Sequence, residues 1–359
     1  MSKKGEIKTI LGIDTSCDET SVAIVEKTRI LANVISSQVE LHRKYGGVVP
    51  MIAKREHEAN LPLVIAEAFT RACNSEGKKI SWKDIDAIAV TYGPGLAIAL
   101  EVGIKEAKAL AEKYDKPLIA VNHMEGHLLS SLGLNSKGKG NIAYEDLKFP
   151  VMGLLVSGGH TELILMRQFG DYEILGRTVD DAIGEAYDKV ARMLGLGYPG
   201  GKVLTEFAKK GDSEKYTLPI PMSKDPTLNF SYSGLKTALF YLLREKEKQA
   251  IKLSKQDIYD YAASFEKSAC AAIEVKLKRA LKQYQPNALL VGGGVAASVK
   301  LRRIIRSTAK KFNVKTYFPV SSALYTDNGA MIAIAGYFQA QRQDFADADL
   351  DRNPNLELS

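Results

Sequence analysis

The chain presents the same pattern of apolar runs twice, and this repetition constrains its fold more than any other feature. Residues 9–14 and 21–26 are apolar runs joined by a polar turn. Residues 151–156 and 161–166 repeat the arrangement around a turn of serine and glycine. Short apolar runs that alternate with helix-like periodicity are typical of α/β folds. We therefore expect two related α/β lobes, each of which begins with a β-hairpin.

Further strands and helices alternate along the rest of the chain. We expect strands at 86–91, 117–121 and 288–291 and helices at 52–73, 97–112, 295–311 and 328–339. Residues 137–141 are rich in glycine and lysine, which suits a linker. The predicted organisation is an N-terminal lobe at 1–141, a C-terminal nucleotide-binding lobe at 142–326, a closing helix at 327–343 and a disordered acidic tail at 344–359.

Composition and cysteine content indicate the cellular compartment of the protein. Apolar residues make up 45% of the chain and charged residues 25%, as in ordinary soluble domains. No apolar run reaches the ~18 residues that a membrane span requires. The three cysteines, Cys17, Cys73 and Cys270, are too few for a disulfide framework and favour a reducing compartment. We therefore expect a cytoplasmic protein with no membrane segment.

The positive charge is unevenly distributed. The formal net charge is +7, but the segment 344–359 alone carries −4, so the remainder carries +11. Residues 300–315 include seven lysines and arginines and no acid. Arg302, Arg303, Arg306 and Lys310 should face solvent, because the apolar residues between them form one stripe of a helix. This pattern fits either a surface that binds a polyanion such as RNA or a plain solvated helix face.

Two of the five histidines are four residues apart, in the sequence His123-Met124-Glu125-Gly126-His127. On a helix both imidazoles would share one face and could hold one metal ion. The alternative is a pair of capping or core histidines. Glu125 should point away from that face, which excludes the zincin arrangement. A third ligand could come from Asp327, although an N-cap of the last helix is the more ordinary role for that residue.

Carboxylates and glycines mark the other candidate sites. Asp14, Asp18 and Glu19 surround the first turn and could orient a cation, a hydroxyl or an amine. The turn at residues 157–159 could bring backbone N–H groups to a phosphate or could simply be a tight hairpin. The turn at residues 292–294 fits a dinucleotide pattern, but no acid follows it before residue 326, which makes a nicotinamide enzyme unlikely.

Taken together and in order, these segments resemble the tRNA N6-adenosine threonylcarbamoyltransferase family (TsaD), formerly described as O-sialoglycoprotein endopeptidases. The resemblance spans residues 9–340. It rests on Gly12-Ile13-Asp14-Thr15-Ser16-Cys17-Asp18-Glu19-Thr20, Gly93-Pro94-Gly95-Leu96, the histidine motif, Val156-Ser157-Gly158-Gly159-His160-Thr161, Asp188-Lys189 with Tyr198-Pro199-Gly200-Gly201, and Thr326-Asp327-Asn328.

The resemblance implies an actin-like (ASKHA) two-lobed fold with duplicated RNase-H-like cores and an interlobe cleft. It implies transfer of threonylcarbamoyl from threonylcarbamoyl-AMP to N6 of adenosine 37, in tRNAs that read codons beginning with A, with release of AMP. It also implies accessory proteins of the TsaB and TsaE type. An actin-fold ATPase or sugar kinase, or less plausibly a metalloprotease, is the alternative.

The same resemblance implies the roles of particular residues. The metal of the family, usually iron and here expected as Fe²⁺, would fall on His123, His127 and Asp327. The donor would contact Leu155, Val156, Ser157, Gly158, Gly159, Asp188, Gly201 and Ser298. The family usually has asparagine in place of Ser298, which offers a hydroxyl instead of an amide. The candidate catalytic residues, Asp18 and Glu19, are taken from the acidic turn itself and not from the resemblance.

Overall fold

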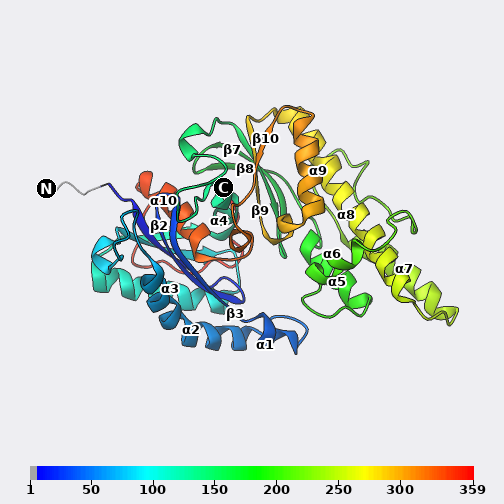
Figure 1. Ribbon diagram of the computed structural model, residues 1–359, viewed down its shortest axis with the longest axis horizontal. Coiled ribbons are helices and arrows are strands. Elements are labelled where there is room, and N and C mark those ends of the chain that lie inside the picture. The colour runs from blue at the N-terminus through cyan, green and yellow to red at the C-terminus, as the bar shows by residue number, and fades with distance from the viewer. Residues whose placement is uncertain (1–5) are drawn as a thin grey trace. The chain divides into compact units, whose positions relative to one another are not determined.

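The computed structural model describes residues 6–359, which divide into two compact units (Figure 1). Unit 1 contains the described residues up to Leu147 together with Gln168–Tyr172 and Tyr317–Ser359. Unit 2 contains Lys148–Arg167 and Glu173–Thr316. The closing helix and the acidic tail are thus part of unit 1, and the first boundary lies at residue 147 where the sequence suggested 141. No helix of residues 6–359 is both long and apolar enough to cross a membrane.

Unit 1 is built on a five-stranded sheet of order β3-β2-β1-β4-β5. The strands are β1 (Thr9–Asp14), β2 (Glu19–Glu26), β3 (Arg29–Ser37), β4 (Ala87–Gly93) and β5 (Leu118–Asn122). The first three strands form an antiparallel meander, and β4 and β5 continue the sheet in parallel with β1. The hairpin predicted at residues 9–26 is confirmed, whereas β3 was not anticipated.

Side-chain alternation along β1 assigns the two faces of this sheet. Leu11 and Ile13 join a core with helices α2 (Pro50–Arg71) and α3 (Ala97–Tyr114). Gly12 faces the opposite side, where an added Cβ would lie 2.3 Å from the carbonyl oxygen of Gly329. That side is covered by α10 (Gly329–Gln341), which is buried around almost its whole circumference (Figure 1). The short helices α1 (Val39–Arg43) and α4 (His123–Leu129) complete the unit.

The acidic segment 344–359 differs from the disorder that its charge suggested. Ala346 N–H donates to Leu118 O at 2.8 Å, and Ala346 and Leu350 pack against the core of the unit. Leu358 is only 6% exposed. These apolar residues are spaced between the acids, so the segment can bury them while its carboxylates remain in water.

Unit 2 repeats the same sheet topology, with the order β10-β9-β6-β7-β8. Its strands are β6 (Val151–Val156), β7 (Thr161–Gln168), β8 (Asp171–Arg177), β9 (Ala288–Gly292) and β10 (Lys315–Tyr317). As in unit 1, the first strand pairs antiparallel with the second and parallel with the fourth. This equivalence confirms the duplicated α/β architecture predicted from the two hairpins.

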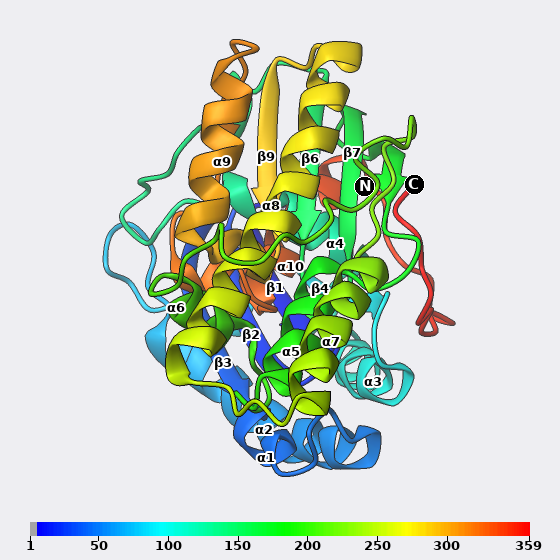
Figure 2. The ribbon, with the colours of Figure 1, turned by 90° about the vertical axis from the view of Figure 1, so that its right-hand side faces the viewer.

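Helices cover the second sheet, and Figure 2 shows α8 and α9 on one side of β9 and β6. The helices of this unit are α5 (Ile183–Met193), α6 (Gly201–Ala208), α7 (Ser233–Lys248), α8 (Lys255–Tyr284) and α9 (Val299–Lys310). The helix predicted at 295–311 is divided in two, because a 3₁₀ turn at Gly294–Ala297 precedes α9. Ser298 separates the two parts and caps α9, since its hydroxyl accepts from Leu301 N–H at 3.4 Å.

Candidate metal centre

Helix α4 begins directly at the carboxyl end of β5 and carries both histidines of the motif. Asn122 is its N-cap, because the Asn122 Oδ1 atom accepts from Met124 N–H at 2.8 Å. The cap fixes the first turn, and the spacing of four places both imidazoles on one face, with ring centroids 4.7 Å apart. Both histidines are more than nine-tenths buried.

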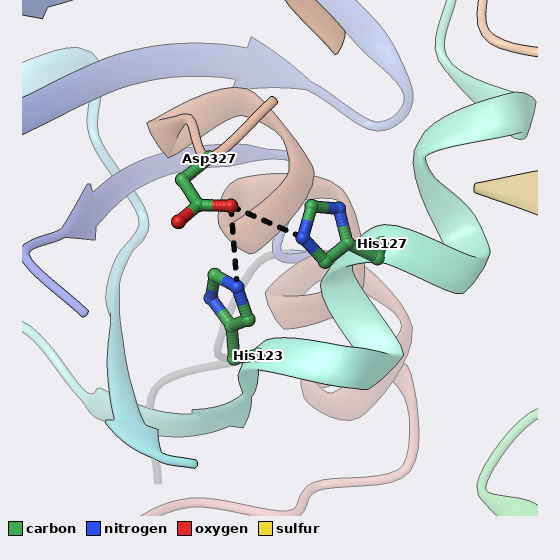
Figure 3. A group of neighbouring side chains, drawn as sticks. All are labelled: His123, His127 and Asp327. Carbon is green, nitrogen blue, oxygen red and sulfur yellow. Dashed lines mark hydrogen bonds and ion pairs between the residues drawn. The ribbon is translucent and has the colours of Figure 1, made fainter. Parts of the chain in front are cut away.

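Asp327 meets these histidines because another residue caps the last helix. The side chain of Asn328 accepts from Met331 N–H at 3.0 Å and thereby caps α10. The N-cap role that the sequence favoured for Asp327 is therefore wrong. Its Oδ1 atom lies 3.1 Å from His127 Nε2 and 3.4 Å from His123 Nε2 (Figure 3).

These three side chains fit a divalent metal ion. One donor atom from each lies within 4.8 Å of the other two. The Nδ1 atoms of both histidines are buried without a hydrogen-bond partner among residues 6–359, while the Nε2 atoms converge on the carboxylate. Two imidazoles and one carboxylate are a donor set that suits Fe²⁺ or Zn²⁺. We therefore define His123, His127 and Asp327 as the candidate metal centre.

The charges around the centre favour a cation. Burial alone would lower the pKa of His123, but the carboxylates of Asp327 and Asp14 raise it to about 10. The pKa of Asp327 is lowered despite its burial, because His123 and His127 are beside it. Asp14 accepts a hydrogen bond from Thr91 at 2.8 Å and lies 3.7 Å from His123 Nδ1, which is an ion-pair distance. A bound metal would take the place of the proton that His123 holds.

The acidic turn between β1 and β2 faces the same charges. The pKa of Glu19 is raised to about 10, first by burial and then by the carboxylates of Asp327 and Asp18. Its Oε1 atom accepts from Ser37 Oγ at 3.3 Å. The carboxylate of Asp327 in the candidate metal centre therefore affects Glu19, and the catalytic role of Asp18 and Glu19 stays a prediction.

A buried histidine that the sequence did not single out holds this turn in place. His57 on α2 is fully buried, and its Nε2 atom lies 3.0 Å from the carbonyl oxygen of Cys17. A carbonyl only accepts, so this nitrogen carries the proton, and Nδ1 accepts from Thr20 Oγ1 at 2.8 Å. Burial lowers the pKa of His57, which suits this neutral form. The only sequence signal was the rarity of histidine in the chain.

Glu125 lies away from the metal-binding face of α4, as its position in the motif predicted. Its carboxylate accepts from Tyr172 Oη at 2.7 Å and from Gln339 Nε2 at 2.8 Å. The side chain is 3% exposed, and burial raises its pKa. A glutamate held in this way cannot serve as the base of a zincin site.

The glycine turn of unit 2 is an open loop at the end of β6. Ser157 N–H donates to His160 O at 2.8 Å, and the Ser157 hydroxyl accepts from His160 N–H at 3.1 Å. Neither Gly158 nor Gly159 has a positive φ, and a Cβ on either would meet no atom within 4 Å. The hairpin itself therefore does not require glycine here, and the space beside these residues is open to a ligand.

The other residues expected to contact the threonylcarbamoyl donor lie in β6, α5, α6 and the cap of α9. Leu155 and Val156 are buried in β6. Asp188 on α5 accepts from Gly200 N–H at 2.9 Å and from Gly201 N–H at 2.7 Å, so the structure brings Asp188 and Gly201 together. The adjacent turn after β9 needs Gly293, which has a φ of 90° and whose added Cβ would lie 2.4 Å from Val156 O. Ser298 follows this turn as the cap of α9.

Comparison with known proteins identifies relatives over nearly the whole chain. A family model described as tRNA N6-adenosine threonylcarbamoyltransferase matches residues 29–334. The chain is 46% identical over 349 residues to a protein of that name from Thermosipho africanus (strain TCF52B), covering 97% of this chain and 99% of the relative. A protein of the same name from Carboxydothermus hydrogenoformans is 45% identical, with 98% of each chain covered.

Among solved structures, HypF of T. kodakarensis superimposes with a TM-score of 0.60 at 15% identity, over 94% of this chain and 48% of HypF. At that identity the likeness shows the fold alone, and it supports the predicted actin-like class. The family match and the two relatives cover nearly the whole chain. The chain therefore belongs to the tRNA N6-adenosine threonylcarbamoyltransferase family of tRNA-modifying enzymes.

Proposed function

We propose that this enzyme transfers threonylcarbamoyl from threonylcarbamoyl-AMP to N6 of adenosine 37, in tRNAs that read codons beginning with A. The observation that carries this proposal is the convergence of His123, His127 and Asp327 beside an acidic turn, in a chain whose relatives are named for the transfer.

In the proposed step, the N6 nitrogen forms a bond to the carbamoyl carbon of the donor. The bond from that carbon to the phosphate oxygen breaks, and AMP leaves with the bonding electron pair. The N6 nitrogen then gives up one proton. Glu19 is the proposed acceptor with Asp18 beside it, because a nearby cation would lower the raised pKa of Glu19 and free its carboxylate.

His123, His127 and Asp327 would hold one divalent ion, proposed to be Fe²⁺. When bound, such an ion can polarise the carbamoyl carbonyl or hold the carboxylate and hydroxyl of the threonyl group. The protein's own contribution is to fix this donor set through the Asn122 and Asn328 caps, which place α4 and Asp327 before any ligand arrives.

The proposed donor contacts are Leu155, Val156, Ser157, Gly158, Gly159, Asp188, Gly201 and Ser298 in unit 2. The open space beside Gly158 and Gly159 supports an approach of the phosphate to the backbone. Both lone pairs of one Asp188 oxygen are occupied by the N–H groups of Gly200 and Gly201, which leaves the other oxygen to accept from a ribose hydroxyl.

tRNA is the substrate that the family name gives, and α9 offers it a basic face. Arg303, Arg306 and Lys310 are exposed, whereas Arg302 is half-buried, and Leu301 and Ile305 face the interior. Cations on one face of a helix can pair with phosphates and accept several tRNA sequences. We further propose that the reaction takes place in the cytoplasm with accessory proteins of the TsaB and TsaE type.

The test is mass analysis of tRNA nucleosides after incubation with threonine, bicarbonate, ATP and the accessory enzymes. The expected product is N6-threonylcarbamoyladenosine at position 37, formed in equal amount to AMP when threonylcarbamoyl-AMP is supplied directly. His123→Ala should form none. ATP hydrolysis without tRNA, in the absence of any modified nucleoside, would instead indicate an ATPase of this fold.

A further inference from the structure

Residues 353–359 pack against the loop between β4 and α3. Asn353 N–H donates to Tyr92 O at 2.7 Å, and Pro354 O accepts from Gly95 N–H at 3.1 Å. The approach is close, since a Cβ on Gly93 would lie 1.9 Å from Asn353 O. Only glycine at this position therefore lets the segment pass.

The same loop is linked to the acidic turn. Leu96 N–H donates to Ser16 O at 2.7 Å, and Ser16 lies two residues before Asp18. An added Cβ on Gly95 would lie 2.7 Å from the same Ser16 oxygen. Residues 353–359 thus contact the loop, and the loop contacts the acidic turn. These contacts leave little room for any of the three to shift independently.

The segment also reaches the helix of the metal centre. Asn122 is 7% exposed, and its side chain makes two hydrogen bonds of opposite sense. Its Oδ1 atom caps α4 at Met124 N–H, while its Nδ2 atom donates to Glu357 O at 3.1 Å. The acceptor on the segment therefore fixes the rotamer in which Asn122 caps the helix.

We propose that residues 353–359 are a positioning segment for the metal centre, which acts through Asn122 on helix α4 and through the loop after β4. The inference rests on the metal centre proposed above. His123 directly follows the capped position, and α4 has only seven residues, so its first turn carries a large share of the helix. Once Glu357 O is removed, Asn122 can rotate, and the first turn loses part of its order before a metal binds.

The experiment compares metal affinity in matched variants of the full chain. Asn122→Ser keeps a good N-cap without adding charge but is too short to reach Glu357 O. Asn355→Ser is the control, because it makes the same chemical change at an exposed position of the segment. A third variant ends after Arg352, and a fourth combines that truncation with Asn122→Ser. Competition with a chromophoric chelator measures Zn²⁺ and Co²⁺ affinity, and His123→Ala shows that binding is at this centre.

We expect Asn122→Ser to weaken metal binding about fivefold, the affinity ratio that corresponds to one net hydrogen bond. The truncated chain should be weakened at least as much, and Asn122→Ser should add almost nothing to it. Asn355→Ser should bind like the unaltered chain. In the metal-free protein, hydrogen exchange of α4 amides should accelerate in Asn122→Ser, while amides of α3 keep their rates.

Three results would overturn the proposal. If the truncated and Asn122→Ser proteins bind metal like the unaltered chain while His123→Ala does not, the segment has no positioning role, although the proposed function stands. If His123→Ala keeps its metal, the centre itself is misassigned. Equal acceleration of exchange in α3 and α4 would show that the segment merely stabilises the whole unit.

Discussion

The raised pKa of His123 predicts that metal binding releases a proton from this histidine. It should do so even at a pH at which an ordinary histidine is already neutral. With its pKa at about 10, His123 is protonated at pH 7 in the metal-free protein. A histidine binds a metal ion only in its neutral form, so binding has to remove that proton. The cost is about 4 kcal/mol at pH 7 and falls by about 1.4 kcal/mol per pH unit. Metal affinity should therefore rise about tenfold per unit between pH 7 and 8.5.

Titration calorimetry in buffers with different heats of ionisation measures the protons released. The unaltered chain should release at least one proton from its own groups at pH 8. Asp14→Asn is the matched variant, because the amide oxygen can still accept from Thr91 and Ser16 and no metal ligand is changed. It removes one charge that raises the pKa of His123, so its metal affinity should stop rising at a lower pH than that of the unaltered chain.

The reasoning would be refuted by stoichiometric metal binding whose affinity is flat between pH 7 and 8.5 and which releases no proton. It would equally be refuted if the metal affinity of Asp14→Asn stopped rising at the same pH as that of the unaltered chain. In either case the carboxylates around His123 would not control its protonation, and the electrostatic account of the centre would fail.

Four further predictions follow from the geometry. His127→Ala should remove most bound metal and most transfer activity, because two donors hold a divalent ion poorly, and metal analysis together with the nucleoside assay checks this. Gly158→Val should abolish binding of the adenylate by calorimetry without lowering the melting temperature, since its added atoms enter open space. In the metal-free protein, the stability contributed by His123 should be complete below pH 6.5, its ordinary pKa, and should be lost as the pH rises toward 10, as denaturation at several pH values would show. Arg303→Ala with Lys310→Ala should weaken binding of all substrate tRNAs alike and flatten the salt dependence by ~0.7–0.9 log units per lost phosphate contact, with unchanged adenylate affinity.

Local sequence patterns were sufficient to predict the α/β architecture. The two hairpins and the strands at β4, β5 and β9 were predicted because a buried strand needs a short apolar run bounded by turn residues, and that requirement is visible in the sequence. β3 was missed because Asn33 and the two serines at its end divide its apolar residues into short runs, and the strand is only partly buried. The pair His123 and His127 was also visible, because residues four apart lie on the same face of a helix.

The third ligand could not be assigned from local sequence. Asp327 and Asn328 are adjacent, and both are good N-caps. Which of them caps α10, and which points toward α4, depends on how α10 packs against the sheet of unit 1. The structure decides this through Asn328, and the carboxylate of Asp327 is thereby directed at residues about 200 positions away in the chain.

The order of the acidic segment was not predicted for a related reason. Its charge is a property of the sequence, whereas its order depends on hydrogen-bond partners and apolar surface contributed by β4, β5 and Asn122. The sequence by itself determined the duplicated α/β fold and the pair of histidines, because short-range periodicity encodes both. Only the tertiary structure decided what surrounds those histidines, since Asp14 and Asp327 lie beside them, and residues 353–359 contact the neighbouring Asn122, through contacts that no local pattern records.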